Sequence, residues 1–544
     1  MCSTALLIAS LSGCKSAAEF RAEADVEAYG LIAARRAALF DEEGGFSIDP
    51  PEGSVRQRIV SGEWDASIPL TLVDLLEIAA ENSHDVRSNR EGLYRAALDL
   101  TLEQWRNGVQ QDAGGSASLT DSGSSESASA SVSTGFSKVL DTGASVLAEV
   151  GSGLFRIVST GDGVDLVTDL HLRITQPLLA GFGPSVTREA LTQSERNLIY
   201  EVRDYERFRR TFAVNVARQM YSVLRAADTV TNEENNLENL ILLTVRNRAL
   251  ADAGRLKDQE VDQAKQNELR SENRLLQLSG NLERNMDELK LFLGLPIDIE
   301  ITLDKSELDR LGAEDPWLGD EPVAELVACQ VALQERLEFQ TVRDSLEDRE
   351  RGIVVFEDAL RAGLDLTLDG RAGSDDGSPL DYRGSNAPWS LSLGLDLPVD
   401  RVSERNAYRR ELIAVENARR TLEREEDSIR LAVRDSLRQV RNVAKSYTIQ
   451  QGAEVLANRR VESTQLMMAA GRASTRDQLE AQDALLEARN ATTAALVDLT
   501  LTRLDFYLDL ELLRVDERGM FIDEDVASLL RQPAEVEELG EVQP

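Results

Sequence analysis

The sequence predicts a mixed, mainly helical protein in which one unit, made of long antiparallel helices and a β-hairpin, occurs twice. Three observations lead to this prediction. The tripeptide Ala253-Gly254-Arg255 recurs 217 residues later as Ala470-Gly471-Arg472. Apolar residues follow the helical period around both tripeptides, and apolar and polar residues alternate in the segments between the helices. Self-similarity at a fixed offset indicates that a structural unit has been duplicated.

The composition limits the classes of function. The 544 residues include 60 Lys and Arg against 96 Asp and Glu, and the formal net charge of −36 argues against a nucleic-acid partner. With 42% hydrophobic residues and only 13 Pro, the chain suits long helices better than disorder. Two His, three Cys and the lack of an HExxH, GxSxG, Walker or GxGxxG motif offer little to catalysis or metal binding. We therefore expect no enzyme, no metal and no cofactor.

The first residues indicate an export signal. A short apolar run over residues 4–11 ends in Leu11-Ser12-Gly13-Cys14, with small residues directly before a cysteine. This pattern resembles the bacterial lipoprotein box, in which the cysteine becomes the acylated first residue. We expect a lipoprotein-type signal over residues 1–14, a lipid attached at Cys14, and an N-terminal extension over residues 15–62 with a helix near residues 17–41. No segment reaches eighteen consecutive apolar residues, so no transmembrane helix is expected.

The repeats are expected over residues 63–300 and 301–513, followed by an acidic tail over residues 514–544. Each should contain a long helix without proline, from about 185 to 251 and from about 402 to 470, and a returning helix that ends near 293 and 513. Gly254 and Gly471 then lie at the tips of two helical hairpins, as helix C-cap residues. At the offset of 217, apolar positions that step by threes, fours and sevens coincide, which favours coiled-coil packing. These pairs are Phe212 with Ile429, Val216 with Val433, Met220 with Leu437, and Val223 with Val440.

Alternating segments predict a β-hairpin in each copy, at about 114–178 and about 362–399. In the second copy, Leu391, Leu393 and Leu395 alternate with small or polar residues. Such strands suit a membrane barrel, although a half-buried sheet on a soluble core gives the same pattern. The offset between the copies falls from 253 before the hairpins to 221 after them, so the first copy holds 32 extra residues. Two hairpins give four strands, and three chains would supply twelve strands to close a barrel.

These features together resemble the TolC-type outer-membrane efflux protein family over about residues 60–515. The resemblance rests on the order and duplication of short motifs: Pro69-Leu70-Thr71-Leu72-Val73-Asp74, Asn82-Ser83-His84-Asp85-Val86, Gln176-Pro177-Leu178-Leu179, and the two Ala-Gly-Arg tips. It implies a homotrimer with a 12-stranded β-barrel in the outer membrane and an α-helical tunnel that extends into the periplasm. The tips would dock on a periplasmic adaptor (membrane fusion) protein that is fed by an inner-membrane transporter.

The resemblance also implies an acidic periplasmic entrance. The family places acidic side chains shortly after the second tip glycine, at positions that correspond to Asp477 and Glu480, and Glu260 matches the first of these in the first repeat. These carboxylates line the entrance, or they lie on a solvated helix face. Arg255 and Arg472 contact the adaptor, or they complement helix C-terminal dipoles. The expected function is an exit duct for efflux or secretion; the alternative is an exported coiled-coil scaffold of the cell envelope without a pore.

Overall fold

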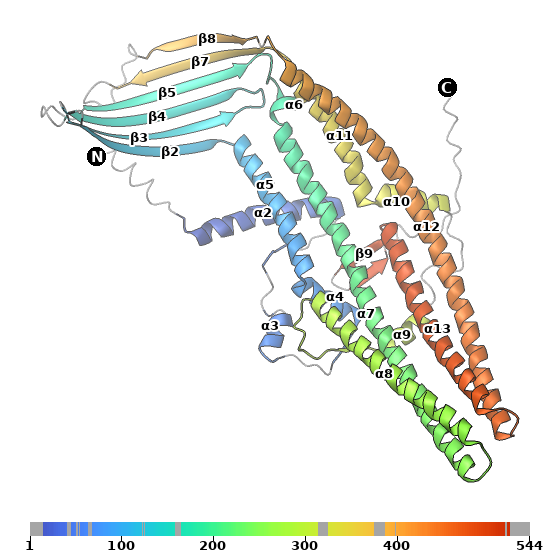
Figure 1. Ribbon diagram of the computed structural model, residues 1–544. Helices are drawn as coiled ribbons and strands as arrows, with labels where there is room; N and C mark the ends of the chain where they lie inside the picture. Colours follow the sequence, from blue (N-terminus) through green and yellow to red (C-terminus); the bar gives the residue numbers. More distant parts are fainter. Residues whose placement is uncertain are drawn as a thin grey trace, which may run out of the picture. The chain divides into compact units, whose positions relative to one another are not determined.

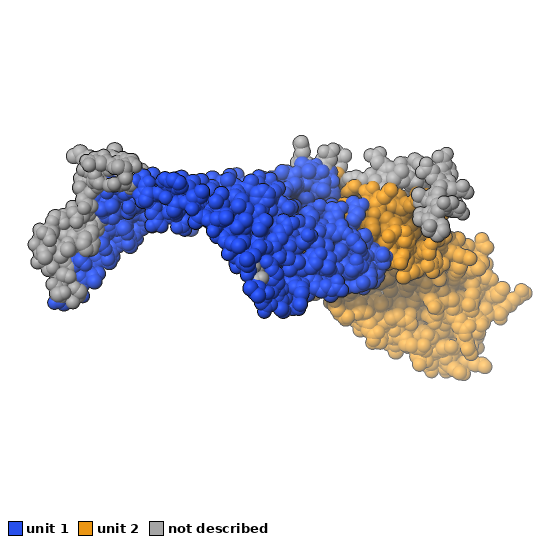
Figure 2. All heavy atoms as spheres, turned by 90° about the horizontal axis from the view of Figure 1, so that it is seen from above, with its two compact units in different colours: residues 1–46, 92–203, 341–424 blue, residues 47–91, 204–340, 425–544 orange. Residues whose placement is uncertain are grey.

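The computed structural model describes residues 15–40, 45–49, 53, 55–63, 68–121, 123, 126–157, 165–313, 325–374, 387–397, 399–516 and 519–522. The chain divides into two compact units, coloured separately in Figure 2. Unit 1 comprises residues 1–46, 92–203 and 341–424, and unit 2 comprises residues 47–91, 204–340 and 425–544. The compact units therefore do not follow the two sequence repeats, because each unit takes segments from both.

The helices carry the duplication that the sequence predicts (Figure 1). The first copy contains α4 (Leu72–Asn82), α5 (His84–Asn107), α7 (Glu189–Asp252) and α8 (Asp258–Phe292). The second contains α10 (Glu325–Glu335), α11 (Leu337–Asp358), α12 (Val402–Ala469) and α13 (Thr475–Asp509). The bounds of α4 and α10 differ by 253 residues at both ends, and those of α8 and α13 by 217. The predicted offsets are thus the offsets of the helices themselves.

Shorter helices complete the helical part. They are α2 (Ala17–Phe40), α3 (Val55–Val60), α6 (Pro184–Thr187) and α9 (Ser306–Ala313). The helix predicted in the N-terminal extension is α2, and it packs on α5 inside unit 1, where Tyr94 donates a hydrogen bond to Asp25 at 2.7 Å. Among the described residues, no helix combines the length and the apolar character needed to cross a membrane.

One antiparallel sheet lies in unit 1 and has six strands in the order β2-β3-β4-β5-β7-β8 (Figure 1). Four strands come from the first copy: β2 (Gln110–Asp121), β3 (Glu126–Val139), β4 (Ser145–Ile157) and β5 (Asp165–Pro177). The second copy adds β7 (Gly363–Gly373) and β8 (Trp389–Asp396), the hairpin that the sequence predicts there.

The prediction of one hairpin in the first copy, and so of four strands per chain, is wrong. The first copy has two hairpins because its 32 extra residues form a second pair of strands. Apolar alternation does not reveal the boundary between β2 and β3, since Ser, Gly and Ala fill most of the segment from Gly114 to Gly135. The offsets identify the extra pair. β2 begins 253 residues before β7, and β5 ends at Pro177, 221 residues before Pro398, which follows β8. β2 and β5 therefore correspond to β7 and β8, and the inserted strands are β3 and β4.

Unit 2 contains the main hydrophobic core, in which the predicted helical stripe is buried. Val216, Met220 and Val433 are completely buried, and the other positions paired at the offset of 217 are also buried. The rings of Phe212 on α7 and Phe292 on α8 stack at 5.1 Å. The sheets of unit 2 are small: β1 (Pro69–Leu70) pairs in parallel with β6 (Thr302–Leu303), and β9 (Leu513–Asp516) pairs with β10 (Gly519–Ile522).

A charged network is buried in the same unit. Arg210 on α7 is 1% exposed and contacts Glu206 and Glu511, which are each 2% exposed. Arg207 also binds Glu511, at 2.7 Å. Burial raises the pKa of Glu206, but Arg209 and Arg210 outweigh burial and hold that pKa below its usual value. Glu511 has φ of +57° at the end of α13, a left-handed position that usually belongs to glycine.

Candidate functional site at the helical hairpin tips

Both hairpin tips are closed by the same backbone motif. At the end of α7, the N–H of Gly254 bonds to the carbonyl of Ala251 at 2.8 Å, and the N–H of Arg255 bonds to that of Leu250 at 2.8 Å. At the end of α12, Gly471 and Arg472 bond in the same way to Met468 and Met467, at 3.1 and 2.8 Å. This is a Schellman motif, which satisfies the last helix carbonyls and needs a left-handed residue.

The two glycines meet that need, with φ of +70° at Gly254 and +71° at Gly471. A Cβ at either position would meet no atom within 4 Å, so the backbone angle, and not space, favours glycine. Arg255 and Arg472 follow the glycines and are exposed. Neither has an ion-pair partner among the residues that the structure describes, so both guanidinium groups are available at the tips.

Asp477 helps to begin α13. Its Oδ2 accepts hydrogen bonds from the N–H and the hydroxyl of Ser474, both at 2.8 Å, while the Ser474 hydroxyl accepts from the Asp477 N–H at 3.3 Å. This reciprocal pair is a capping box. The Ser474 N–H, and then its hydroxyl, lower the pKa of Asp477 below its usual value. The carboxylate is therefore charged at neutral pH, exposed, and fixed in position.

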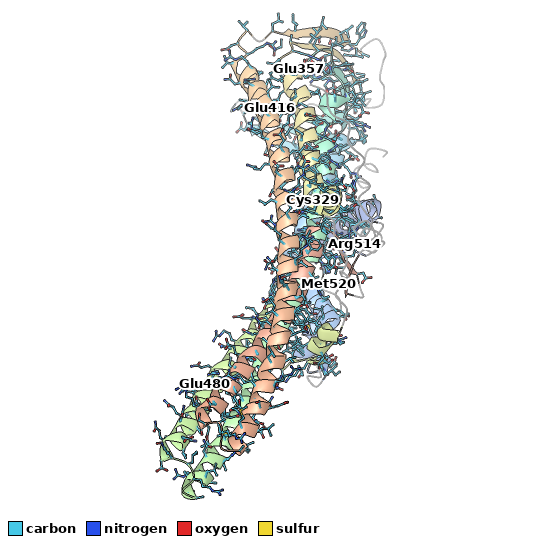
Figure 3. The ribbon with its side chains drawn as sticks, turned by 90° about the vertical axis from the view of Figure 1, so that its right-hand side faces the viewer. Cys329, Glu357, Glu416, Glu480, Arg514 and Met520 are labelled. Atoms are coloured by element: carbon cyan, nitrogen blue, oxygen red, sulfur yellow. The ribbon has the colours of Figure 1, made fainter. Side chains whose placement is uncertain are left out.

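Glu480 lies on the same helix near the tip (Figure 3) and is partly neutralised by arginines. Its Oε1 accepts a hydrogen bond from Nε of Arg476 at 2.9 Å, and its Oε2 lies 3.8 Å from Arg460 of α12. The side chain remains 51% exposed, so it can still contribute to the field around the tip.

Glu260 serves a different contact, which joins the two hairpins. Its Oε2 accepts a hydrogen bond from the hydroxyl of Thr475 at 3.0 Å, and that hydroxyl accepts one from Nδ2 of Asn247 at 3.1 Å. Asn247 and Thr475 are buried, at 0% and 1% exposure. The structure thus brings Glu260 to the first turn of α13. Asn247 and Thr475 are not predictable as functional residues from the sequence, because single polar residues on a helix give no signal of a buried contact.

Apolar packing supports this junction. Leu240 and Leu243 of α7, Ala264 of α8 and Leu479 of α13 form a small buried cluster, and Met468 packs against it. The first repeat's hairpin is therefore held to the second by both apolar contacts and the hydrogen bonds of Thr475. A movement that separates the hairpins must break both.

The sheet of unit 1 carries a second functional feature, because its two faces differ across the strands. On one face, Ile174 pairs with Leu368, and Leu368 with Leu391. On the other face, Asp369 binds both His171 at 2.8 Å and Arg173 at 2.9 Å. His171 is thus on the polar face, and His84 is exposed at the start of α5. Cys14 lies outside the described residues.

The apolar face is exposed. Val150, Leu170, Leu391, Leu393 and Leu395 are between 42% and 62% exposed. A sheet with one exposed apolar face and one polar face is typical of strands that separate lipid from a water-filled lumen. A soluble protein would cover such a face with helices or a second sheet.

Comparisons with known proteins agree with this arrangement. Residues 328–507 match the family described as outer membrane efflux protein. A search of curated proteins finds no match. The chain is similar to the Campylobacter jejuni CmeC outer membrane channel, with a TM-score of 0.58 and 13% identity over 92% of this chain and 95% of that one. It is similar to VceC from Vibrio cholerae, with a TM-score of 0.57 and 14% identity over 82% and 96%. It is also similar to the open state of the Neisseria gonorrhoeae MtrE outer membrane channel, with a TM-score of 0.58 and 13% identity over 81% of this chain and 88% of that one.

Proposed function

We infer that this chain, which belongs to the outer membrane efflux protein family, is an outer-membrane exit duct that passes substrates from the periplasm to the exterior. Members of this family are trimeric channels, not enzymes, and they work with adaptor proteins and inner-membrane transporters. The observation that carries the inference is the sheet of unit 1, whose exposed apolar face and polar face suit lipid and water. An exported scaffold without a pore, the alternative, gives these faces no role and has no support from the comparisons.

We propose that three copies of this chain assemble and that the hairpin tips dock on a periplasmic adaptor. The exposed Arg255 and Arg472 supply the charges that this contact would use, and the Schellman motifs of Gly254 and Gly471 hold them in equivalent places. An adaptor that pulls the tips apart would act on the contact between Thr475 and Glu260. The junction between the hairpins would then set the resistance to opening.

Asp477 and Glu480 are proposed to make the entrance selective for cations. In a trimer each carboxylate occurs three times around one axis, and such rings raise the local concentration of cations and bind divalent ions. Asp477 remains charged because its pKa is lowered. Arg476 partly neutralises the charge of Glu480, so Asp477 should contribute more to the cation selectivity than Glu480 does.

The test is single-channel recording in planar bilayers. We compare the native protein with the double variant Asp477→Asn and Glu480→Gln, since Asn keeps an acceptor for Ser474 and preserves the start of α13. The matched control is Asp435→Asn, because Asp435 is also an exposed carboxylate beside an arginine on a long helix. The double variant should lose cation selectivity and divalent block, and the control should keep both. Unchanged selectivity in the double variant would place these carboxylates on an outer, solvated face.

The lipid anchor is proposed separately. The Leu11-Ser12-Gly13-Cys14 box supports acylation at Cys14, and mass spectrometry of the mature N-terminus tests it. A mature chain that begins elsewhere, without a lipid, would refute the anchor. It would leave the exit duct standing, because the strands do not depend on an acyl chain whose affinity for membranes is marginal on its own.

A further inference from the structure

The two edges of the six-stranded sheet are open in the part of the chain that the structure describes. The strand order places β2 at one edge and β8 at the other, so each is paired on one side only. All residues of β8 are exposed, as are all residues of β2 except the first. A strand in a bilayer cannot leave a row of backbone N–H and C=O groups unpaired. If the sheet lies in a membrane, as the proposed function requires, both edges need a partner strand.

The extra strands continue the faces of the rest of the sheet. On the apolar face, Phe136 of β3 pairs with Ala148 of β4, and Ala148 pairs with Leu172 of β5. On the polar face, the hydroxyls of Ser116 and Ser131 are 2.8 Å apart. A hairpin that projects from a barrel as a soluble loop has water on both sides, so it does not need one apolar and one polar face. The alternation therefore places β2, β3 and β4 in the same wall as β5, β7 and β8.

The strand directions fit closure by a second copy of the chain. Every neighbouring pair from β2 to β8 is antiparallel, so the two edge strands of this even-numbered sheet run in opposite directions. The β8 of one copy can then pair with the β2 of the next in the same antiparallel manner. The lengths also suit the role, since β2 has 12 residues and β8 has 8.

We propose that β2 of one copy pairs with β8 of the next, so that three copies close a membrane barrel of eighteen strands in which all six strands of each chain take part. The inference rests on the proposed trimer in the outer membrane and departs from the twelve strands expected from two hairpins. The diameter of a barrel grows roughly in proportion to its strand number, so this barrel is about 1.5 times as wide as one of twelve strands. The added strand β3 lines it with neutral hydroxyl groups such as that of Ser129, which lies 2.8 Å from the hydroxyl of Ser118 on β2.

Cross-linking tests which strand meets β8 of the neighbouring copy. The pair Ser116→Cys and Ser392→Cys places thiols on the polar faces of β2 and β8, and a short bis-maleimide should join three chains into a covalent trimer. The control pair, Gly153→Cys and Ser392→Cys, joins β4 to β8 only if β2 and β3 lie outside the barrel. Single-cysteine variants control for the native cysteines.

Each outcome has one meaning. Covalent trimers from the first pair alone support the pairing of β2 with β8, and covalent trimers from the second pair overturn it. Whether β3 and β4 lie in the wall between them is decided by the deletion described next. If outer-membrane trimers form but neither pair cross-links, the edge pairing is also wrong. The absence of trimers in every variant and in the native protein would instead refute the proposed function, so the two failures are distinguishable.

A deletion tests the width. Removal of residues 126–157 takes out β3 and β4, which together with their turn make up the 32 extra residues, and it leaves a chain with four strands. Graded polyethylene glycols are added to the barrel side of single channels in planar bilayers. The native channel should admit polymers that the shortened channel excludes, by about 1.5-fold in polymer radius. Equal cut-offs would show that β3 and β4 do not enlarge the barrel, and if the deletion does not assemble, the cross-linking result decides.

Discussion

An arginine at Leu393 should separate a membrane sheet from a soluble one. Leu393 lies on β8, is 62% exposed, and pairs with Leu366 on the apolar face. Its neighbour Ser392 pairs with Thr367 on the polar face. The variants Leu393→Arg and Ser392→Arg thus place the same charge at nearly the same depth on opposite faces.

The magnitude follows from the position of Leu393 in its strand. It lies four residues from Trp389 and three from Asp396, so at ~3.4 Å per residue and a tilt of ~40° it is about 10 Å from the loop end of β8. The apolar band of such barrels is about 25 Å tall, which places Leu393 near the midplane. An arginine there costs about 2–4 kcal/mol, and therefore about 6–12 kcal/mol in a trimer. Ser392→Arg faces water and avoids this cost.

The assay is the yield of heat-stable trimers in the outer-membrane fraction, with channel conductance measured on the trimers that form. Leu393→Arg should abolish assembly, whereas Ser392→Arg should assemble and alter conductance. Equal yields from the two variants would refute the placement of this sheet in lipid, because a sheet with water on both faces tolerates both charges.

Three further outcomes follow from the structure. Glu511→Ala should lower the free energy of unfolding by about 3 kcal/mol, the lower end for a broken buried ion pair, because the buried Arg210 loses one of its two carboxylate partners and keeps only Glu206. Glu511→Gly should cost about 1 kcal/mol less, because glycine adopts the positive φ freely; denaturant titration measures both. Gly471→Ala should destabilise the tip by about 1–2 kcal/mol, because alanine is strained at a positive φ, and trypsin should then cleave faster after Arg472. Gly471→Asn should have a smaller effect on both, because asparagine tolerates this backbone conformation better. The capping contribution of Asp477 should persist at neutral pH and disappear only as the pH falls through its lowered pKa, below the usual value of 3.8. Rate-corrected hydrogen exchange of the first turn of α13 at about pH 6 and about pH 2 checks this, and equal protection at the two pH values would contradict it.

The positions of the helices could be predicted from the sequence, because duplication supplies two independent observations of each boundary. Thr71 and Asp74, which belong to the first motif of the resemblance, form a capping box at the start of α4. The residues Gly254 and Gly471 could be placed at turns because few residues other than glycine adopt a positive φ without cost. These features depend on the backbone preferences of residues that are close together in the sequence, so they can be recognised without a structure.

The buried polar contacts could not be predicted in the same way. Glu511 is one of 96 acidic residues, and nothing near it in sequence indicates that Arg207 and Arg210, about 300 residues earlier, enclose it. The contact of Thr475 with Glu260 likewise joins separate hairpins. Such contacts depend on packing between helices, so they become visible only when the helices are placed.

The extra strands show why a repeat can change length without changing its helices. An insertion of two strands leaves the chain running in its original direction, so β5 still delivers the chain to α6 and α7 as β8 delivers it to α12. A single added strand would reverse that direction and send the following helix to the other side of the membrane. The sequence therefore reveals the insertion as a change of offset, and the need to preserve direction requires that the 32 residues form an even number of strands.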